Sequence, residues 1–160
     1  MSVAVPRVTI VEAVAPAEID AVRTLVLEYR DSLGLDLAFQ QFAEEVAALA
    51  AMYGPPGGAL FLGTLGGVAA GCVGVRPFEP RCCEMKRLYV RPAARGHRLG
   101  RQLAERSMAA ARALGYARMR LDTLPSMQDA QALYVALGFY DIQPYRHSPV
   151  PGTRFLEAAL

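Results

Sequence analysis

Residues 83–101 read CEMKRLYVRPAARGHRLGR, and this segment organises the rest of the chain. Its first eight residues alternate as in a β-strand, which Pro92 ends. We expect one face of this strand to carry Met85, Arg87 and Tyr89, and the other to carry Glu84, Lys86, Leu88 and Val90. A helix is expected from about Leu99 to Leu114, because apolar residues recur there at helical spacing and Gly115 follows.

The loop between this strand and this helix has the features of an anion-binding site. A helix N-terminus presents unpaired backbone N–H groups and the positive end of the helix dipole. Gly96 and Gly100 allow close approach to the backbone, and Arg95, Arg98 and Arg101 add positive charge. A pyrophosphate fits such a place, although neither a Walker A loop nor a GxGxxG dinucleotide motif is present. The alternative is an ordinary basic turn before a helix.

Periodicity and turn residues predict further strands and helices on both sides of this segment. Before it we expect a strand at 7–14, a helix from Pro16 to Leu33, a second helix capped by Asp36 with the stripe Phe39, Phe42, Val46 and Leu49, and a hairpin of 59–65 and 68–75. After it we expect a strand at 116–123, a helix capped by Ser126 and running to Leu137, and strands from Phe139 and at 154–159. This order predicts one mixed α/β domain over 1–160, with a largely antiparallel sheet of about seven strands, four helices and one βαβ crossover.

Composition supports one compact domain in a reducing compartment. The chain has 160 residues, of which 53% are hydrophobic, so it can bury a sizeable core. The odd number of cysteines, with Cys82 and Cys83 adjacent, argues against a disulfide framework. Because the first residues do not form a secretory signal, we expect a cytoplasmic protein.

One uncharged stretch, between Glu45 and Arg76, raises the alternative of a membrane span. Gly63, Gly67 and Gly71 even have the spacing of packed membrane helices. Prolines and glycines at 55–58 cut the stretch, however, and Gly66-Gly67 supplies the turn of a β-hairpin. The hairpin is therefore favoured, and no membrane partner is expected.

Charge is unevenly distributed along the chain. Residues 1–80 hold four arginines and nine acidic residues, whereas residues 81–120 hold ten arginines and Lys86 against Glu84 and Glu105. Such a basic segment favours an anionic ligand, either a phosphorylated cofactor or a nucleic-acid backbone.

Two motifs resemble the GNAT superfamily of N-acetyltransferases. Leu88-Tyr-Val-Arg-Pro-Ala-Ala-Arg-Gly-His-Arg-Leu-Gly-Arg101 is similar to its acetyl-CoA-binding motif, and Ala130-Gln-Ala-Leu-Tyr-Val-Ala-Leu-Gly-Phe139 is similar to its second signature, A-x-x-L-Y-x-x-L-G-F. Together with the order of elements, the resemblance covers nearly the whole chain. Two departures stand out: Arg98 replaces the middle glycine of the loop motif, and Met127 replaces a frequent asparagine.

The resemblance implies an N-acetyltransferase that uses acetyl-CoA and no metal. Coenzyme A would be held by Leu88, Tyr89 and Val90, which pair with the pantetheine arm, and by the backbone of Arg95, Gly96, His97, Arg98, Leu99, Gly100 and Arg101, which binds the pyrophosphate. Tyr134 would be the general acid for the departing thiolate, and Glu84 would be the base that deprotonates the amine, directly or through water. The acceptor would be a small-molecule or peptide amine.

Several alternatives remain open at this point. The Arg-rich segment 81–120 could bind nucleic acid, although no aromatic platform accompanies it, or the fold could sense acyl-CoA without turnover. Cys82 and Cys83 with His97 are too few ligands for a zinc site and lack an orienting acid for thiol chemistry. Asp122-Thr123 and Pro144–His147 are candidates for an acceptor pocket. A homodimer is left open.

Overall fold

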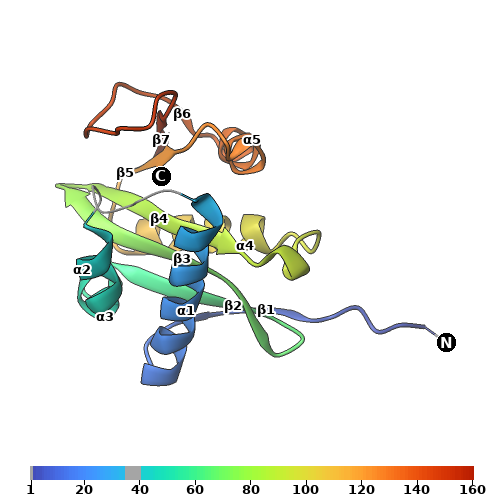
Figure 1. Ribbon diagram of the computed structural model, residues 1–160. Helices are drawn as coiled ribbons and strands as arrows, with labels where there is room; N and C mark the ends of the chain where they lie inside the picture. Colours follow the sequence, from blue (N-terminus) through green and yellow to red (C-terminus); the bar gives the residue numbers. More distant parts are fainter. Residues whose placement is uncertain (1, 35–40) are drawn as a thin grey trace.

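The computed structural model describes residues 2–34 and 41–160 (Figure 1). In chain order it contains β1 (Val8–Glu12), α1 (Pro16–Leu33), α2 (Phe42–Ala47), α3 (Leu49–Tyr53), β2 (Ala59–Leu65), β3 (Val68–Glu79), β4 (Cys82–Val90), a 3-10 turn (Pro92–Ala94), α4 (Leu99–Ala113), β5 (Arg118–Thr123), α5 (Gln128–Ala136), β6 (Tyr140–Asp141) and β7 (Arg154–Ala159).

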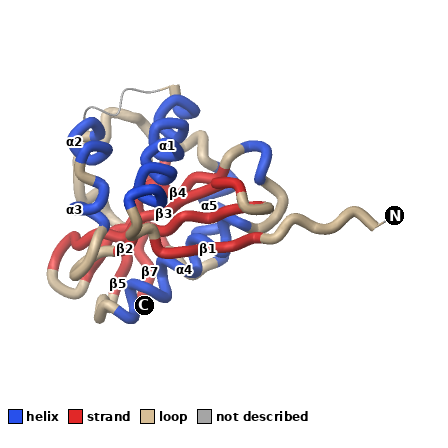
Figure 2. Tube along the Cα trace, turned by 90° about the horizontal axis from the view of Figure 1, so that it is seen from below, coloured by secondary structure: helices blue, strands red, loops and turns tan. Residues whose placement is uncertain are grey.

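The strands form one seven-stranded sheet in the order β1-β2-β3-β4-β5-β7-β6. All neighbours are antiparallel except β4 and β5, which are parallel and are joined through α4. Helices α1, α2 and α3 lie on one face of the sheet, and α4 lies on the other (Figure 2). The mixed α/β class, the largely antiparallel sheet and the βαβ unit are thus confirmed.

The predicted hairpin of β2 and β3 is confirmed, and its glycines serve two purposes. Gly66 and Gly67 have φ of 59° and 82°, the left-handed conformations that a tight hairpin turn requires. Gly63 and Gly71 allow α4 to pack closely on the sheet, since an added Cβ would lie 2.8 Å from Leu99 Cδ1 at Gly63 and 3.0 Å from Leu103 Cδ1 at Gly71. This close packing fixes the N-terminal end of α4 beside β4. None of the described helices is long and apolar enough to cross a membrane.

Strand β4 contains a bulge that corrects the predicted alternation of its side chains. Its register to β3 passes from Tyr89 opposite Cys72 to Lys86 opposite Gly74, so β4 has one extra residue in between. Arg87 takes up this residue with φ of 61°. Met85 therefore lies in the same core cluster as α4, while Arg87 faces α1 and α2 on the other side of the sheet. The expectation that Met85, Arg87 and Tyr89 share one face is wrong.

The second predicted helix also needs correction. It is divided at Ala48, whose φ of −121° and ψ of 30° end α2 and begin α3. On α2 the buried residues are Phe42 and Glu45. Glu45 is buried because its carboxylate turns inward to pair with Arg87. Asp36 and Phe39, the predicted cap and the first residue of the stripe, lie outside the described residues. Helix α5 begins after Met127, and its N-terminus has no side-chain cap, so Ser126 is not the cap residue.

Candidate active site

Strands β4 and β5 separate where the site lies. They pair only from Cys82 to Glu84 on β4, and beyond this point the edge of β4 that faces β5 has no strand partner. A cavity of about 40 Å³ occupies the gap and is lined by Met85 to Leu88 and by Leu121 to Leu124. A second cavity of about 580 Å³ adjoins it, since Tyr29, Leu33, Leu88, Met127 and Ala130 line both. The larger volume lies in the usual range of ligand sites, roughly 300–1,000 Å³.

The larger cavity has an anion cradle at the start of α4. None of the backbone N–H groups from Gly96 to Arg101 donates to an acceptor within residues 2–34 and 41–160. Gly96 has φ of 88° and Arg98 has φ of 59°, and these two left-handed residues turn the chain into the helix. Arg98 therefore keeps a backbone conformation that favours glycine. Successive free N–H groups at a helix N-terminus suit a phosphate.

Gly100 leaves space in this cradle that a side chain would fill. An added Cβ there would lie 3.6 Å from Val90 Cγ2, an ordinary contact, and both residues line the larger cavity. The residues at the start of α4 thus fit a phosphorylated ligand that approaches the backbone closely.

Most of the predicted cofactor residues line this cavity. They are Leu88, Tyr89, Val90, Arg95, Gly96, Arg98, Leu99 and Gly100. The side chains of His97 and Arg101 do not; Arg101 forms an exposed ion pair of 2.7 Å with Glu105. Because Leu88 to Val90 lie on the unpartnered edge of β4, their backbone groups can pair with an extended ligand as a strand would.

Tyr134 of α5 lines the small cavity together with residues of β4 and β5. Its side chain is 7% exposed and packs edge-to-face on Phe139, with ring centroids 5.7 Å apart. Burial raises the pKa of the Tyr134 hydroxyl well above its usual value. The phenol is therefore protonated at neutral pH and can donate into the cavity.

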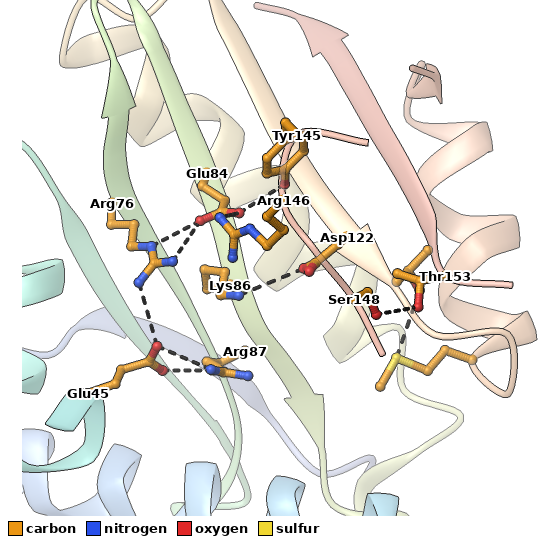
Figure 3. A network of polar contacts seen from close by, with 12 residues as sticks. Glu45, Arg76, Glu84, Lys86, Arg87, Asp122, Tyr145, Arg146, Ser148 and Thr153 are labelled. Atoms are coloured by element: carbon orange, nitrogen blue, oxygen red, sulfur yellow. Dashed lines mark hydrogen bonds and ion pairs between the residues drawn. The ribbon is translucent and has the colours of Figure 1, made fainter. Parts of the chain in front are cut away.

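Glu84 is fully buried and is held by three side chains (Figure 3). Its carboxylate accepts hydrogen bonds from Arg76 Nε at 3.0 Å, Tyr145 Oη at 2.9 Å and Arg146 Nη2 at 2.5 Å. Burial by itself would raise the pKa of Glu84, but Lys86, Arg146 and Arg76 outweigh it and hold the pKa below its usual value. Glu84 lines neither cavity. Its role as the base stays a prediction, and these contacts make it a weak proton acceptor.

The buried carboxylate of Glu84 gives a prediction for stability. We expect Glu84→Gln to lower the free energy of unfolding by about 3 kcal/mol, because two guanidinium groups lose their charged partner in the interior. The pKa of Glu84 is lower in the folded state, so its contribution is complete above the unfolded pKa and is lost as pH falls through the folded value. Urea unfolding at pH 7 and at acidic pH measures this loss, which should be smaller at acidic pH.

The matched control is Glu79→Gln on the same hairpin, whose carboxylate is 42% exposed and pairs with Arg118 and Arg120 at 3.4 Å. That change should cost less than about 1 kcal/mol, as exposed ion pairs do. Equal losses for the two variants would contradict the structural role assigned to Glu84.

The sequence pointed to some of the acceptor-side residues and missed others. Asp122 and Thr123 line the small cavity as predicted, whereas Tyr145 and Arg146 contact Glu84 instead. The structure adds Lys86 and Arg87 to the lining. The sequence could have indicated Lys86, because a lysine in the middle of a buried strand rarely lies there without a partner or a function.

The fold does not bring together the residues of the other candidate sites. Cys82 and Cys83 are buried at the start of β4, while His97 lies beyond its other end. Burial raises the pKa of Cys83 to about 12, which suppresses its thiolate. In the described part of the chain, no group of three potential ligands could hold a metal ion. In the basic segment, Arg87 and Arg91 pair with Glu45 and Glu28 from the acidic half of the chain.

Known proteins similar to this chain in sequence and in fold are acetyltransferases of the GNAT type. Residues 20–139 match the family model described as the acetyltransferase (GNAT) family. An uncharacterised N-acetyltransferase of Schizosaccharomyces pombe is 43% identical over 143 residues, which cover 88% of each chain. The chain therefore belongs to the GNAT family of acetyltransferases.

Solved structures agree with this fold. A GNAT-family acetyltransferase of Staphylococcus aureus has a TM-score of 0.78 at 17% identity, with 96% of this chain and 99% of that chain covered. YncA, an acetyltransferase of Salmonella typhimurium whose structure contains its cofactor acetyl-CoA, has a TM-score of 0.67 at 20% identity and covers 95% and 93% of the two chains.

Proposed function

We propose that this protein transfers the acetyl group of acetyl-CoA directly to a primary amine of a small-molecule or peptide acceptor. The observation that carries the proposal is the run of free N–H groups from Gly96 to Arg101 at one end of the larger cavity, with Tyr134 at the adjoining small cavity. A phosphate site at one end and a buried proton donor at the other fit a long phosphorylated thioester. YncA, with acetyl-CoA in its structure, has the same fold and supports this choice of donor.

Acetyl-CoA supplies an activated acetyl thioester when it is bound. The backbone of Gly96 to Arg101 would hold its phosphates, and the backbone groups of Leu88 to Val90 would pair with the pantetheine arm. Tyr134 donates its proton, or a hydrogen bond, to the sulfur that leaves as a thiolate. Because burial holds the pKa of Tyr134 above its usual value, the phenol keeps its proton and stabilises the leaving thiolate by donating a hydrogen bond to it.

The amine must lose a proton before its nitrogen can attack the thioester. Glu84 remains the candidate for this step through water, and its pairing with Arg76 and Arg146 weakens it as a base. Asp122 lines the small cavity and is the other carboxylate within reach of an amine there. The pH profile of Glu84→Gln separates the two, because an unchanged acidic limb of kcat/KM removes Glu84 from the role.

The experiment for the proposal follows thiol release from acetyl-CoA with a panel of amines, amino acids and peptides. We expect release that depends on both enzyme and acceptor. We also expect acetyl-CoA at a hundred times its Kd to stabilise the fold by about 2.7 kcal/mol, since it binds only the folded state.

The other candidate functions give different results in the same experiment. Stabilisation by acetyl-CoA without turnover of any amine would indicate an acyl-CoA sensor. Salt-dependent DNA binding without stabilisation by acetyl-CoA would indicate a nucleic-acid-binding domain and overturn the proposal.

A further inference from the structure

Lys86 is a buried cation that the proposed reaction does not use. Its side chain is 3% exposed, and its ammonium lies 3.7 Å from the Asp122 carboxylate, beyond hydrogen-bond distance (Figure 3). The Nζ atom donates no hydrogen bond to any residue that the structure describes. Three N–H donors therefore remain free at the wall of the small cavity, which Lys86 lines.

The charged groups around Lys86 compensate it only in part: burial lowers the pKa of Lys86 to about 8, because Asp122 and Glu84 favour the ammonium less than burial and the neighbouring arginines oppose it. Arg87 is held by Glu45 at 2.6 and 3.2 Å, and Arg76 and Arg146 are held by Glu84. We call these side chains, with Lys86 and Asp122, the polar cluster. It holds four cations against three carboxylates, counted over residues 2–34 and 41–160. Arg76 and Arg146 are partly exposed, so the excess positive charge is costly chiefly at Lys86, which is 3% exposed, and an anion that joins Lys86 lowers this cost.

The small cavity has room and partners for such an anion. Its volume of about 40 Å³ exceeds what one water needs, about 10–15 Å³, and fits a group the size of a carboxylate. Lys86 is the donor that it offers, because the other lining hydroxyls are engaged: Thr123 donates to Met127 Sδ, Thr153 to Val150 O, and Ser148 shares a hydrogen bond with Thr153. Tyr134 lies in the same lining, so an anion bound here is adjacent to the place of acyl transfer.

We propose that Lys86 binds a carboxylate carried by the acceptor close to its amine, so that the acceptor is an amino acid or a related small amino carboxylate. This inference rests on the proposed function and selects one class among its acceptors. An acceptor of this class brings the anion that the polar cluster lacks and satisfies the free donors of Lys86. Polyamines and other polycations, by contrast, would add positive charge beside Lys86 and the arginines of the cluster.

The test compares acceptors that differ only in the carboxylate: leucine with isopentylamine, phenylalanine with phenethylamine, and lysine with cadaverine. Thiol release from acetyl-CoA is measured for each, and kcat/KM is expressed per free amine so that differences in amine pKa cancel. The best carboxylated acceptor should exceed its partner by about tenfold or more, the effect of a hydrogen bond to a charged group. Equal or better turnover of the amines without carboxylate overturns the inference and leaves the proposed function intact.

Variants of Lys86 locate the effect. Lys86→Gln should bring the ratio within each pair close to one, whereas Lys86→Arg, which keeps the charge, should retain part of it. Thermal unfolding tests whether both variants are folded. The comparison of acceptors in the wild type does not depend on the variants. An unchanged ratio in a folded Lys86→Gln overturns the inference.

A binding measurement gives an independent readout. Lys86 is the only lysine in the sequence, so protein labelled with [ε-13C]lysine gives one side-chain NMR signal. With coenzyme A present, this signal should shift on addition of the best amino acid of the panel and stay in place with its decarboxylated partner. The opposite pattern, or no shift with the amino acid, contradicts the inference. If neither class of acceptor is acetylated, the proposed function itself fails.

Discussion

Tyr134→Phe should lower kcat by about 10²-fold or more while the Kd for acetyl-CoA stays nearly unchanged, because it removes a positioned acid. The phenol is buried at the wall of the small cavity, and burial keeps it protonated at neutral pH. Phenylalanine keeps the edge-to-face packing on Phe139, so the fold and the cofactor cavity are preserved. Steady-state kinetics across pH and calorimetric titration with acetyl-CoA measure the two quantities.

The matched control for this change is Tyr140→Phe. Tyr140 is 50% exposed and donates its hydroxyl proton to Glu157 at 3.0 Å, outside both cavities. This variant should keep kcat within about twofold of the wild type, because it touches no reacting group. If Tyr134→Phe also keeps the wild-type kcat at every pH, Tyr134 is a core residue and the assignment of the acid is wrong.

Gly100→Val should weaken acetyl-CoA binding by about 100-fold, which corresponds to about 2.7 kcal/mol. Its side chain would enter the space beside the free N–H groups, where we propose that the phosphates bind. The position itself tolerates a Cβ, whose nearest neighbour is Val90 Cγ2 at 3.6 Å. The loss should therefore appear in the Kd for acetyl-CoA and only as a small change in the melting temperature without ligand.

Ala109→Val controls for the cost of a β-branched residue in the same helix. Ala109 is exposed and does not line the cavity, so its variant should bind acetyl-CoA as the wild type does. Acetylpantetheine, which lacks the phosphates of coenzyme A, should bind equally to wild type and Gly100→Val. Equal acetyl-CoA affinity in Gly100→Val and wild type would place the phosphates elsewhere.

Local patterns predicted much of the fold. The Gly66-Gly67 turn and its flanking strands depend on conformations that neighbouring residues determine, so the hairpin could be read from the sequence. The start of α4 at Leu99 follows from its apolar spacing in the same way. The crossover of β4, α4 and β5 followed from the order of elements, which favours a parallel pair on either side of a helix.

Long-range pairing determines what the sequence could not predict. The bulge at Arg87 could not be predicted, because no glycine stands at this position of positive φ. An ion pair with Glu45, 42 residues away, holds the Arg87 side chain on the α2 face instead. The same pair buries an acidic residue of α2, which hydrophobic periodicity places in solvent. The free ammonium of Lys86 likewise depends on which arginines its neighbouring carboxylates have already bound.

The most direct test of the account observes the cradle itself. In 15N-labelled protein, the backbone amide signals of Gly96 to Arg101 should show the largest shifts on addition of acetyl-CoA, with amide protons moving downfield as they donate to phosphate oxygens. These groups have no acceptor within the described part of the chain when the protein is alone, so each is free to respond. Binding that leaves these signals in place and shifts amides elsewhere would contradict the proposed position of the cofactor and the mechanism built on it.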